Sequence, residues 1–144
     1  MKICVINGPN INLLGQREPE IYGDKTYSDL IEYIKEEAYS LGIDVDCFQS
    51  NHEGVLIDWI HEGIGKVDGF IINAGGYSHT SIALMDAVKG SGIPTIEVHI
   101  SNTKKREDFR KKSYLALVVN KTIEGKGFGG YKEALIWLQG IKDK

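Results

Sequence analysis

The residues of this chain that could carry chemistry begin in the loop after its first apolar run. Residues 3–6 are apolar, and the loop that follows contains Asn7, Asn10, Arg17 and Tyr22. An arginine beside a tyrosine favours the phenolate, because an opposite charge stabilises the ionised form. Arg17 and Tyr22 could therefore create a base. Roughly fifteen residues without regular structure are unusual in a compact domain, and such loops are often lids or binding loops.

The strength of this effect depends on how much water the loop excludes. An isolated tyrosine ionises near pH 10, whereas a useful base must ionise closer to neutrality. One cation at about 4 Å supplies about 1 kcal/mol in water but about 4 kcal/mol at an effective dielectric near 20. We therefore expect the loop to work only when it closes over a substrate.

A second group of candidate residues lies in the apolar segment 94–100 and just beyond it. Glu97, His99 and Ser101 alternate, so in a strand their side chains point to one side. Glu97 could orient the imidazole of His99 for acid–base chemistry. A metal site built from His79, Glu97 and His99 is the competing interpretation, although the chain has no compact ligand motif such as H-E-x-x-H.

The segment after residue 72 has both a structural and a functional interpretation. Asn73 opens the sequence N-A-G-G, which leads to Ser78 and His79. Glycine allows a tight turn and serine can cap a helix, while the free amides of a helix start can also bind an anion. Ser78 is not expected to be a hydrolase nucleophile, because G-x-S-x-G is absent.

Apolar runs typical of strands alternate with helical stripes along the chain. Strands are predicted at 3–6, 43–48, 69–72, 94–100 and 115–119. Helices are predicted at 27–41, 56–64, 84–88 and 131–138. Thr26 followed by Asp29 predicts a capping box at the first of these helices. The alternation predicts an α/β fold, a flavodoxin-like three-layer sandwich with a five-stranded parallel sheet of order 2-1-3-4-5.

The polar candidates share one edge of this predicted sheet. Ligands of parallel sheets bind outside the carboxyl ends of the strands. Asn7 and Asn10 follow the first strand, Asn73 the third, and His99 and Ser101 end the fourth. We therefore expect a polar pocket at this edge.

Length and charge limit the possible functions. The 144 residues suit one catalytic domain, 1–144, and the net charge of −3 argues against nucleic acid as a partner. The basic run at 104–112 is typical of a solvated helix face. We expect Cys4 and Cys47 to be reduced and buried. With no signal peptide and no apolar run near 18 residues, we expect no membrane association and a cytoplasmic protein.

The sequence also bears on several other functions. Gly125, Gly127 and Gly130 match G-x-G-x-x-G, but no strand follows to carry the ribose-binding acid, so these glycines are interpreted as a turn and close packing. A receiver domain would need an acidic cluster where this chain has asparagines. A flavin-binding module and a different cofactor-free lyase or isomerase acting on a polyhydroxy acid remain open.

In these residues and in the segments around them, the chain resembles the type II 3-dehydroquinate dehydratases over nearly its whole length. The matching segments are N-G-P-N-I-N-L-L-G-Q-R-E-P-E-I-Y-G, Q-S-N-H-E-G, N-A-G-G-Y-S-H-T-S, I-E-V-H-I-S-N and R-E-D-F-R-K-K-S-Y. The resemblance implies dehydration of 3-dehydroquinate to 3-dehydroshikimate through an enolate in the shikimate or quinate pathway. It also implies no metal, no organic cofactor and a homododecamer of four trimers.

The resemblance assigns a role to each matching residue. Tyr22 resembles the base, Arg17 the residue that helps to ionise it, and Asn10 the one that stabilises the enolate through a water. His99 resembles the acid that protonates the departing hydroxyl, with Glu97 beside it. Asp86 resembles the residue that reaches a neighbouring subunit's site. The other implied substrate contacts are Asn73, His79, Ile100, Ser101 and Arg110. Val55 and Ala116 depart from the family pattern, where an acid and a serine are common.

Overall fold

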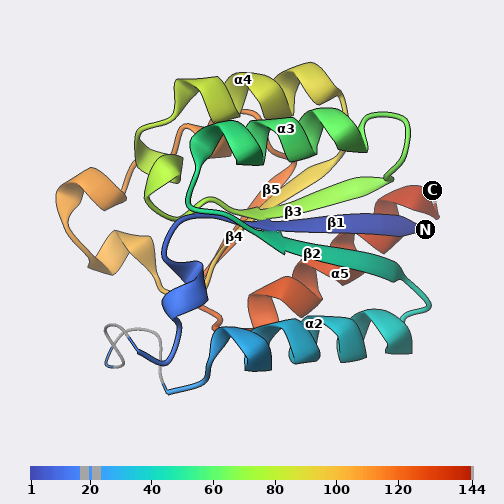
Figure 1. Cartoon of the computed structure of the whole chain (residues 1–144), viewed down its shortest axis with the longest axis horizontal. Helices are drawn as coiled ribbons and strands as arrows, with labels where there is room; N and C mark the ends of the chain where they lie inside the picture. Colours follow the sequence, from blue (N-terminus) through green and yellow to red (C-terminus); the bar gives the residue numbers. More distant parts are fainter. Residues whose placement is uncertain (17–19, 21–23, 144) are drawn as a thin grey trace.

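The computed structural model describes residues 1–16, 20 and 24–143, and within them a parallel sheet separates two layers of helices (Figure 1). The strands follow the order β2-β1-β3-β4-β5. They are β1 (Lys2–Asn7), β2 (Asp44–Gln49), β3 (Gly69–Asn73), β4 (Thr95–His99) and β5 (Lys121–Glu124). The predicted flavodoxin-like order 2-1-3-4-5 is confirmed.

Helices cover both faces of the sheet because the central strands are apolar on both sides. On β1, Ile3 and Val5 pack toward α2 (Tyr27–Ser40) and α5 (Gly129–Lys142). Cys4 and Ile6 pack toward α3 (Glu53–Gly63) and α4 (Ile82–Ser91) on the other side. Figure 1 shows these two pairs of helices on opposite faces, so the three-layer prediction holds.

The start of α2 confirms the capping prediction. The Asp29 amide donates to the Thr26 hydroxyl at 3.2 Å, and the Thr26 amide donates to the Asp29 carboxylate at 2.9 Å. These reciprocal bonds satisfy amides that the first helical turn leaves without partners. They fix where the loop after β1 ends and the helix begins.

The predicted fifth strand at 115–119 is wrong. Residues Leu115–Leu117 form the 3-10 helix η5, and the strand lies later, at Lys121–Glu124. Leu115 is fully buried and Val118 and Val119 are partly buried in the same apolar cluster as α3 and α4, while Leu117 is exposed. β5 pairs only with β4 among the described strands, and within it Ile123 alone is buried, which leaves little apolar pattern to detect.

Two glycines let the loops after β1 and β3 cross in direct contact. A Cβ atom on Gly8 would lie 2.4 Å from the Ala74 carbonyl oxygen, and one on Gly75 would lie 2.8 Å from that of Pro9. Gly75 also has φ +60°, a conformation that glycine adopts without steric cost. The Gly8 amide donates to the Asn73 carbonyl at 2.7 Å, which joins the two strand ends.

Within the loop after β1, Gly15 contacts the segment that leads into α2. With φ +84°, Gly15 packs so closely on the following segment that a Cβ atom would lie 3.0 Å from the Asp24 carbonyl oxygen and 3.2 Å from that of Lys25. Arg17 and Tyr22, the two residues assigned to the base, lie between these points and outside the described residues.

No helix among the described residues is long and apolar enough to cross a membrane. Cys4 is buried and Cys47 half-buried, and both are free thiols. Burial raises the pKa of Cys4 to about 12 and that of Cys47 to about 11, so both behave as small apolar side chains.

Candidate active site

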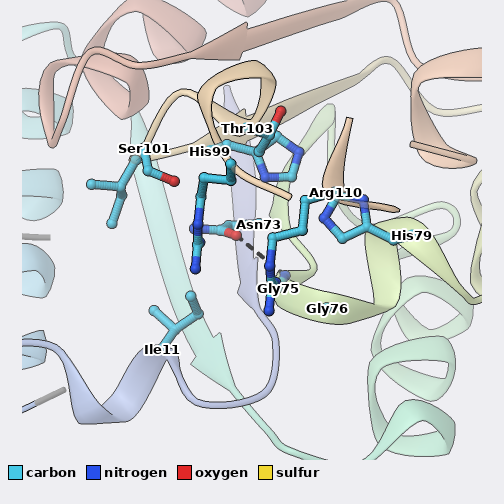
Figure 2. Close-up of a pocket in the computed structure, with 11 residues that line it drawn as sticks. Ile11, Asn73, Gly75, Gly76, His79, His99, Ser101, Thr103 and Arg110 are labelled. Atoms are coloured by element: carbon cyan, nitrogen blue, oxygen red, sulfur yellow. Dashed lines mark hydrogen bonds between the residues drawn. The ribbon is translucent and has the colours of Figure 1, made fainter. Parts of the chain in front are cut away.

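A pocket lies where sequence analysis places one, at the carboxyl ends of β1, β3 and β4 (Figure 2). A hollow with several polar groups that converge on it is the usual form of a small-molecule site. Its walls come from the strand ends and from four segments of 3-10 helix or turn between residues 11 and 110. The lining residues are Ile11, Asn73, Gly75, Gly76, His79, His99, Ile100, Ser101, Thr103, Arg106 and Arg110.

His99 is held by a buried carboxylate. Its Nε2 lies 2.8 Å from Oε2 of Glu97, because residues two apart on β4 share one side of the strand, as predicted. Burial alone would raise the pKa of Glu97, but hydrogen bonds and charge from His99, with hydroxyl donors from Ser113 and Thr122, lower it below its ordinary value. Glu97 is therefore an ionised acceptor, Nε2 of His99 carries a hydrogen, and Nδ1 is the nitrogen left for proton transfer.

His79 faces His99 across the pocket. The two rings are stacked, with centroids 6.2 Å apart and planes 18° apart. Nδ1 of His79 lies 2.6 Å from the Lys112 carbonyl oxygen. Since a carbonyl oxygen only accepts, Nδ1 carries the hydrogen and Nε2 is left for a ligand.

The amide of Asn73 is oriented from below the pocket. Its Oδ1 accepts from the Gly75 amide at 3.3 Å, which places Nδ2 toward the hydroxyl of Tyr131 at 3.1 Å. Tyr131, on α5, in turn donates to Oδ1 of Asn7 at 2.7 Å. Asn7, Asn73 and Tyr131 are all buried. This chain of bonds fixes the orientation of the Asn73 amide, with Oδ1 toward Gly75 and Nδ2 toward Tyr131.

Two arginines give the pocket a positive wall. Arg106 precedes the 3-10 helix η4 (Asp108–Arg110) and Arg110 is its last residue, and their side chains are 11% and 29% exposed. Nε of Arg110 donates to Glu107 at 2.8 Å, and Nε of Arg106 lies 4.0 Å from the same oxygen. With His79 and His99 nearby, this wall favours an anionic ligand even though the chain is acidic overall.

The end of β4 is turned by hydrogen bonds to a glycine turn. The Gly125 amide donates to the carbonyls of His99 and Ser101, and the Gly127 amide donates to that of Ile100 at 3.1 Å. Carbonyl and N–H of one peptide point in opposite directions. The N–H groups of Ile100 and Ser101 therefore point away from the glycine turn.

The chain matches a family model described as "Dehydroquinase class II" over residues 1–139. A 3-dehydroquinate dehydratase from Clostridium perfringens strain 13 is 56% identical, with 100% of both chains covered. The chain belongs to the class II dehydroquinase family. It is also 56% identical to catabolic 3-dehydroquinase 1 from Fusarium vanettenii, with 92% of each chain covered. A crystal structure of type II dehydroquinase from Butyrivibrio crossotus matches with a TM-score of 0.95 and 49% identity, covering 96% of this chain and 97% of that one.

Most of the residues expected from the sequence meet in this pocket. Those that line it are Asn73, His79, His99, Ile100, Ser101 and Arg110, with Glu97 directly behind His99. Asn10 lies beside the lining residue Ile11 but does not line the pocket, and its amide donates to Asn51. Asp86 is exposed on α4 and does not line it either.

Sequence reasoning missed Arg106 and Thr103. The basic run predicts a solvated helix face, but in the structure it forms two 3-10 helices, η3 (Thr103–Lys105) and η4. Arg106 and Arg110 fold onto the pocket, while Lys104 and Lys111 face solvent. The feature of the sequence that could have indicated this is the spacing of four residues between Arg106 and Arg110, which can place both side chains on one side.

The metal interpretation of His79, Glu97 and His99 has little support from their geometry. The His79 Nδ1 and both Glu97 oxygens are engaged by protein groups. Among the described residues, no group of three or more His, Cys, Asp or Glu side chains is arranged to hold a metal ion. The arrangement instead suits an oriented imidazole that transfers a proton.

Proposed function

We propose that this dehydroquinase dehydrates 3-dehydroquinate to 3-dehydroshikimate, with His99 as the acid for the departing hydroxyl. The observation that carries this proposal is the imidazole of His99 bonded to the buried carboxylate of Glu97 in a basic pocket. Nδ1 of His99 carries a transferable proton when the ring is an imidazolium, and the adjacent carboxylate stabilises that charge. Loss of water then leaves a neutral imidazole ready to be reprotonated.

The first half of the reaction removes a proton from the carbon beside the ketone. The resemblance assigns this step to Tyr22 as a phenolate, with Arg17 supplying the nearby positive charge. The enolate oxygen gains charge and needs a preorganised donor, which a water held by Asn10 would supply. The hydroxyl leaves from the carbon β to the ketone, so an enolate is the intermediate that joins both halves.

The substrate carboxylate fits the end of β4 beside the positive wall. The N–H groups of Ile100 and Ser101 supply paired donors, while Arg106 and Arg110 supply charge. The ring hydroxyls then meet Asn73 and His79. The Asn73 amide is already oriented for this contact by Gly75 and Tyr131.

Asp86 is proposed to act in the pocket of a neighbouring copy. It is exposed and does not line its own pocket. Ile82, one helical turn away on the same side of α4, is 54% exposed, and Leu117 on the adjoining η5 is 72% exposed. Such a surface suits contact with another subunit, as in a trimer within a cytoplasmic homododecamer of four trimers. Sedimentation velocity would test the assembly, with a monomer contradicting it.

The activity is tested by incubating the protein with 3-dehydroquinate and following the absorbance of the conjugated enone product. We expect turnover with no added cofactor and the same rate after treatment with a chelator. A spectrum of the purified protein checks the flavin alternative, which predicts a yellow protein. No enone absorbance at any substrate concentration would contradict the proposed function. Loss of activity with the chelator would instead support a metal site at His79, Glu97 and His99.

A further inference from the structure

The carboxylate of Glu97 is surrounded by more donors than a single histidine supplies. Its Oε2 accepts from Nε2 of His99 at 2.8 Å and from the Ser113 hydroxyl at 2.5 Å. Its Oε1 accepts from the Thr122 hydroxyl at 2.9 Å. Glu97 is 0% exposed, so these groups replace the water that an ionised carboxylate would otherwise require.

The direction of the Ser113 bond is fixed by the backbone. The Ala116 amide donates to Oγ of Ser113 at 3.2 Å. An amide N–H can only donate, so this bond occupies a lone pair of the hydroxyl and leaves its hydrogen for Glu97. Thr122 pairs directly with Glu97 in the ladder between β4 and β5, which brings its hydroxyl to the other oxygen.

The segment 112–114 also joins the two histidines. The Lys112 carbonyl accepts from His79, the Ser113 hydroxyl donates to Glu97, and the Tyr114 amide donates to the Ser78 carbonyl at 2.8 Å. One short piece of chain therefore contacts His79 directly and His99 through Glu97. This common support is a physical reason for the near-parallel stacking of the two rings.

We propose that Ser113 and Thr122 are positioning residues for the acid His99. Their hydroxyls hold Glu97 ionised and in a single orientation, and Ser113 additionally ties that carboxylate to the segment that orients His79. Neither residue lines the pocket, so neither contacts the substrate. The inference rests on the proposed function, in which His99 delivers a proton.

The charged surroundings of Glu97 are simple, which makes a pH profile informative. Among the described residues, His99 on β4 contacts it, with His79 stacked behind, and on β5 Glu124 pairs with His99. Thr122 on β5 and Ser113 are neutral, and β3 places Ile72 opposite Glu97. Removing a hydroxyl donor disfavours the carboxylate, so the acidic limb of the kcat profile should move to higher pH.

The experiment compares Thr122→Val with Thr122→Ser and adds Ser113→Ala. Thr122 is exposed on β5, so the valine variant should fold while losing the hydroxyl. We expect Thr122→Val and Ser113→Ala each to lower kcat about tenfold with little change in KM and to move the acidic limb upward, because each hydroxyl acts on proton transfer rather than binding. Thr122→Ser should restore both the rate and the profile.

Ser91→Ala is a matched control. The Ser91 hydroxyl also accepts from a backbone amide and donates to an oxygen, bonding Ile93 and Val88, but it lies outside the pocket. It should leave kcat and the pH profile unchanged. Wild-type kcat and an unmoved acidic limb in both Thr122→Val and Ser113→Ala would overturn the proposal.

A spectroscopic measurement separates this inference from the proposed reaction. The ¹⁵N chemical shifts of the His99 ring report which nitrogen carries hydrogen in the protein without substrate. Thr122→Val should change these shifts, and Thr122→Ser should restore them. If the wild type fails to dehydrate 3-dehydroquinate but the shifts respond in this way, the positioning role stands and the reaction is wrong. Unchanged shifts would contradict the positioning role whatever the reaction.

Discussion

The hydroxyl of Tyr131 donates to Oδ1 of Asn7 at 2.7 Å, joining residues 124 positions apart in the chain. The same hydroxyl accepts from Asn73. One phenol on α5 therefore connects the ends of β1 and β3 beneath the pocket. Because its oxygen accepts one bond and its hydrogen makes the other, no other protein side chain of similar size reproduces both contacts.

Tyr131→Phe should cost stability and weaken substrate binding. The change leaves buried polar atoms of Asn7 and Asn73 without a partner, for which we expect about 1–3 kcal/mol of lost unfolding free energy. KM should rise more than kcat falls, because Asn73 loses its orientation. Urea denaturation and steady-state kinetics measure both effects. Tyr33→Phe, at a half-buried tyrosine beside Phe128, is the control and should be near neutral. Equal stability of Tyr131→Phe and the wild type would refute the argument.

His99→Ala should lower kcat at least about a hundredfold while the protein stays folded, because general acid catalysis contributes about 10²–10⁴-fold. The assay follows the conjugated product, and circular dichroism checks the fold. His52→Ala removes an exposed histidine outside the pocket and should have no effect. A rate for His99→Ala close to that of the wild type would rule out His99 as the acid.

Arg17→Ala should affect the chemical step more than substrate binding. The charge argument requires a cation to stabilise the Tyr22 phenolate, so kcat should fall strongly and KM should change little. Arg17→Lys keeps the charge and should retain more activity than alanine. If Arg17→Ala raised only KM, the phenolate argument would be wrong. Tyr22→Phe should match the loss in kcat.

Gly8→Ala should destabilise the protein by about 1–3 kcal/mol, the usual cost of overpacking. The new methyl group would lie 2.4 Å from the Ala74 carbonyl oxygen, so one loop must shift. Gly140→Ala is the matched control, since a Cβ atom there meets nothing within 4 Å and alanine favours the α5 helix. Urea denaturation should show opposite signs for the two variants, and a stable Gly8→Ala would disprove the close contact.

Glu97 should make stability depend on pH in the acidic range. Its folded-state pKa lies below its ordinary value of 4.5, so its contribution is present above that pH and disappears as pH falls through the lowered pKa. Glu97→Gln should remove this part of the dependence in urea unfolding measured from neutral to acidic pH. Glu36→Gln, at an exposed site on α2, should preserve it. An unaltered pH dependence in Glu97→Gln would show that the carboxylate is not ionised.

The sequence was sufficient to predict most of the fold because the central strands carry strong patterns. Residues 3–6 and 69–72 are buried on both faces, so they appear as continuous apolar runs. β5 has a single buried apolar residue, Ile123, and the stronger run before it packs on helices instead. β5 is therefore specified by its neighbour β4 across the sheet, which a local pattern does not contain.

The site was predictable where spacing along one strand decides the contact, as for Glu97 and His99. It was not predictable where distant segments meet. Arg106 belongs to a basic run whose folding onto the pocket depends on η3 and η4, and Thr122 reaches Glu97 only through the register of β4 with β5. The roles assigned to all the candidate site residues stay predictions, those of Asn10, Asp86, Arg17 and Tyr22 included.

The contact between Gly15 and the backbone of Asp24 bears on the entropic cost of joining the two ends of a loop. Joining the ends of a loop has an entropic cost that grows with the logarithm of loop length. Because Gly15 and Asp24 touch in the folded protein, the cost of bringing these two residues together belongs to folding. A side chain at position 15 would meet the carbonyl oxygens of Asp24 and Lys25, so the effect of such a substitution should appear in the free energy of unfolding.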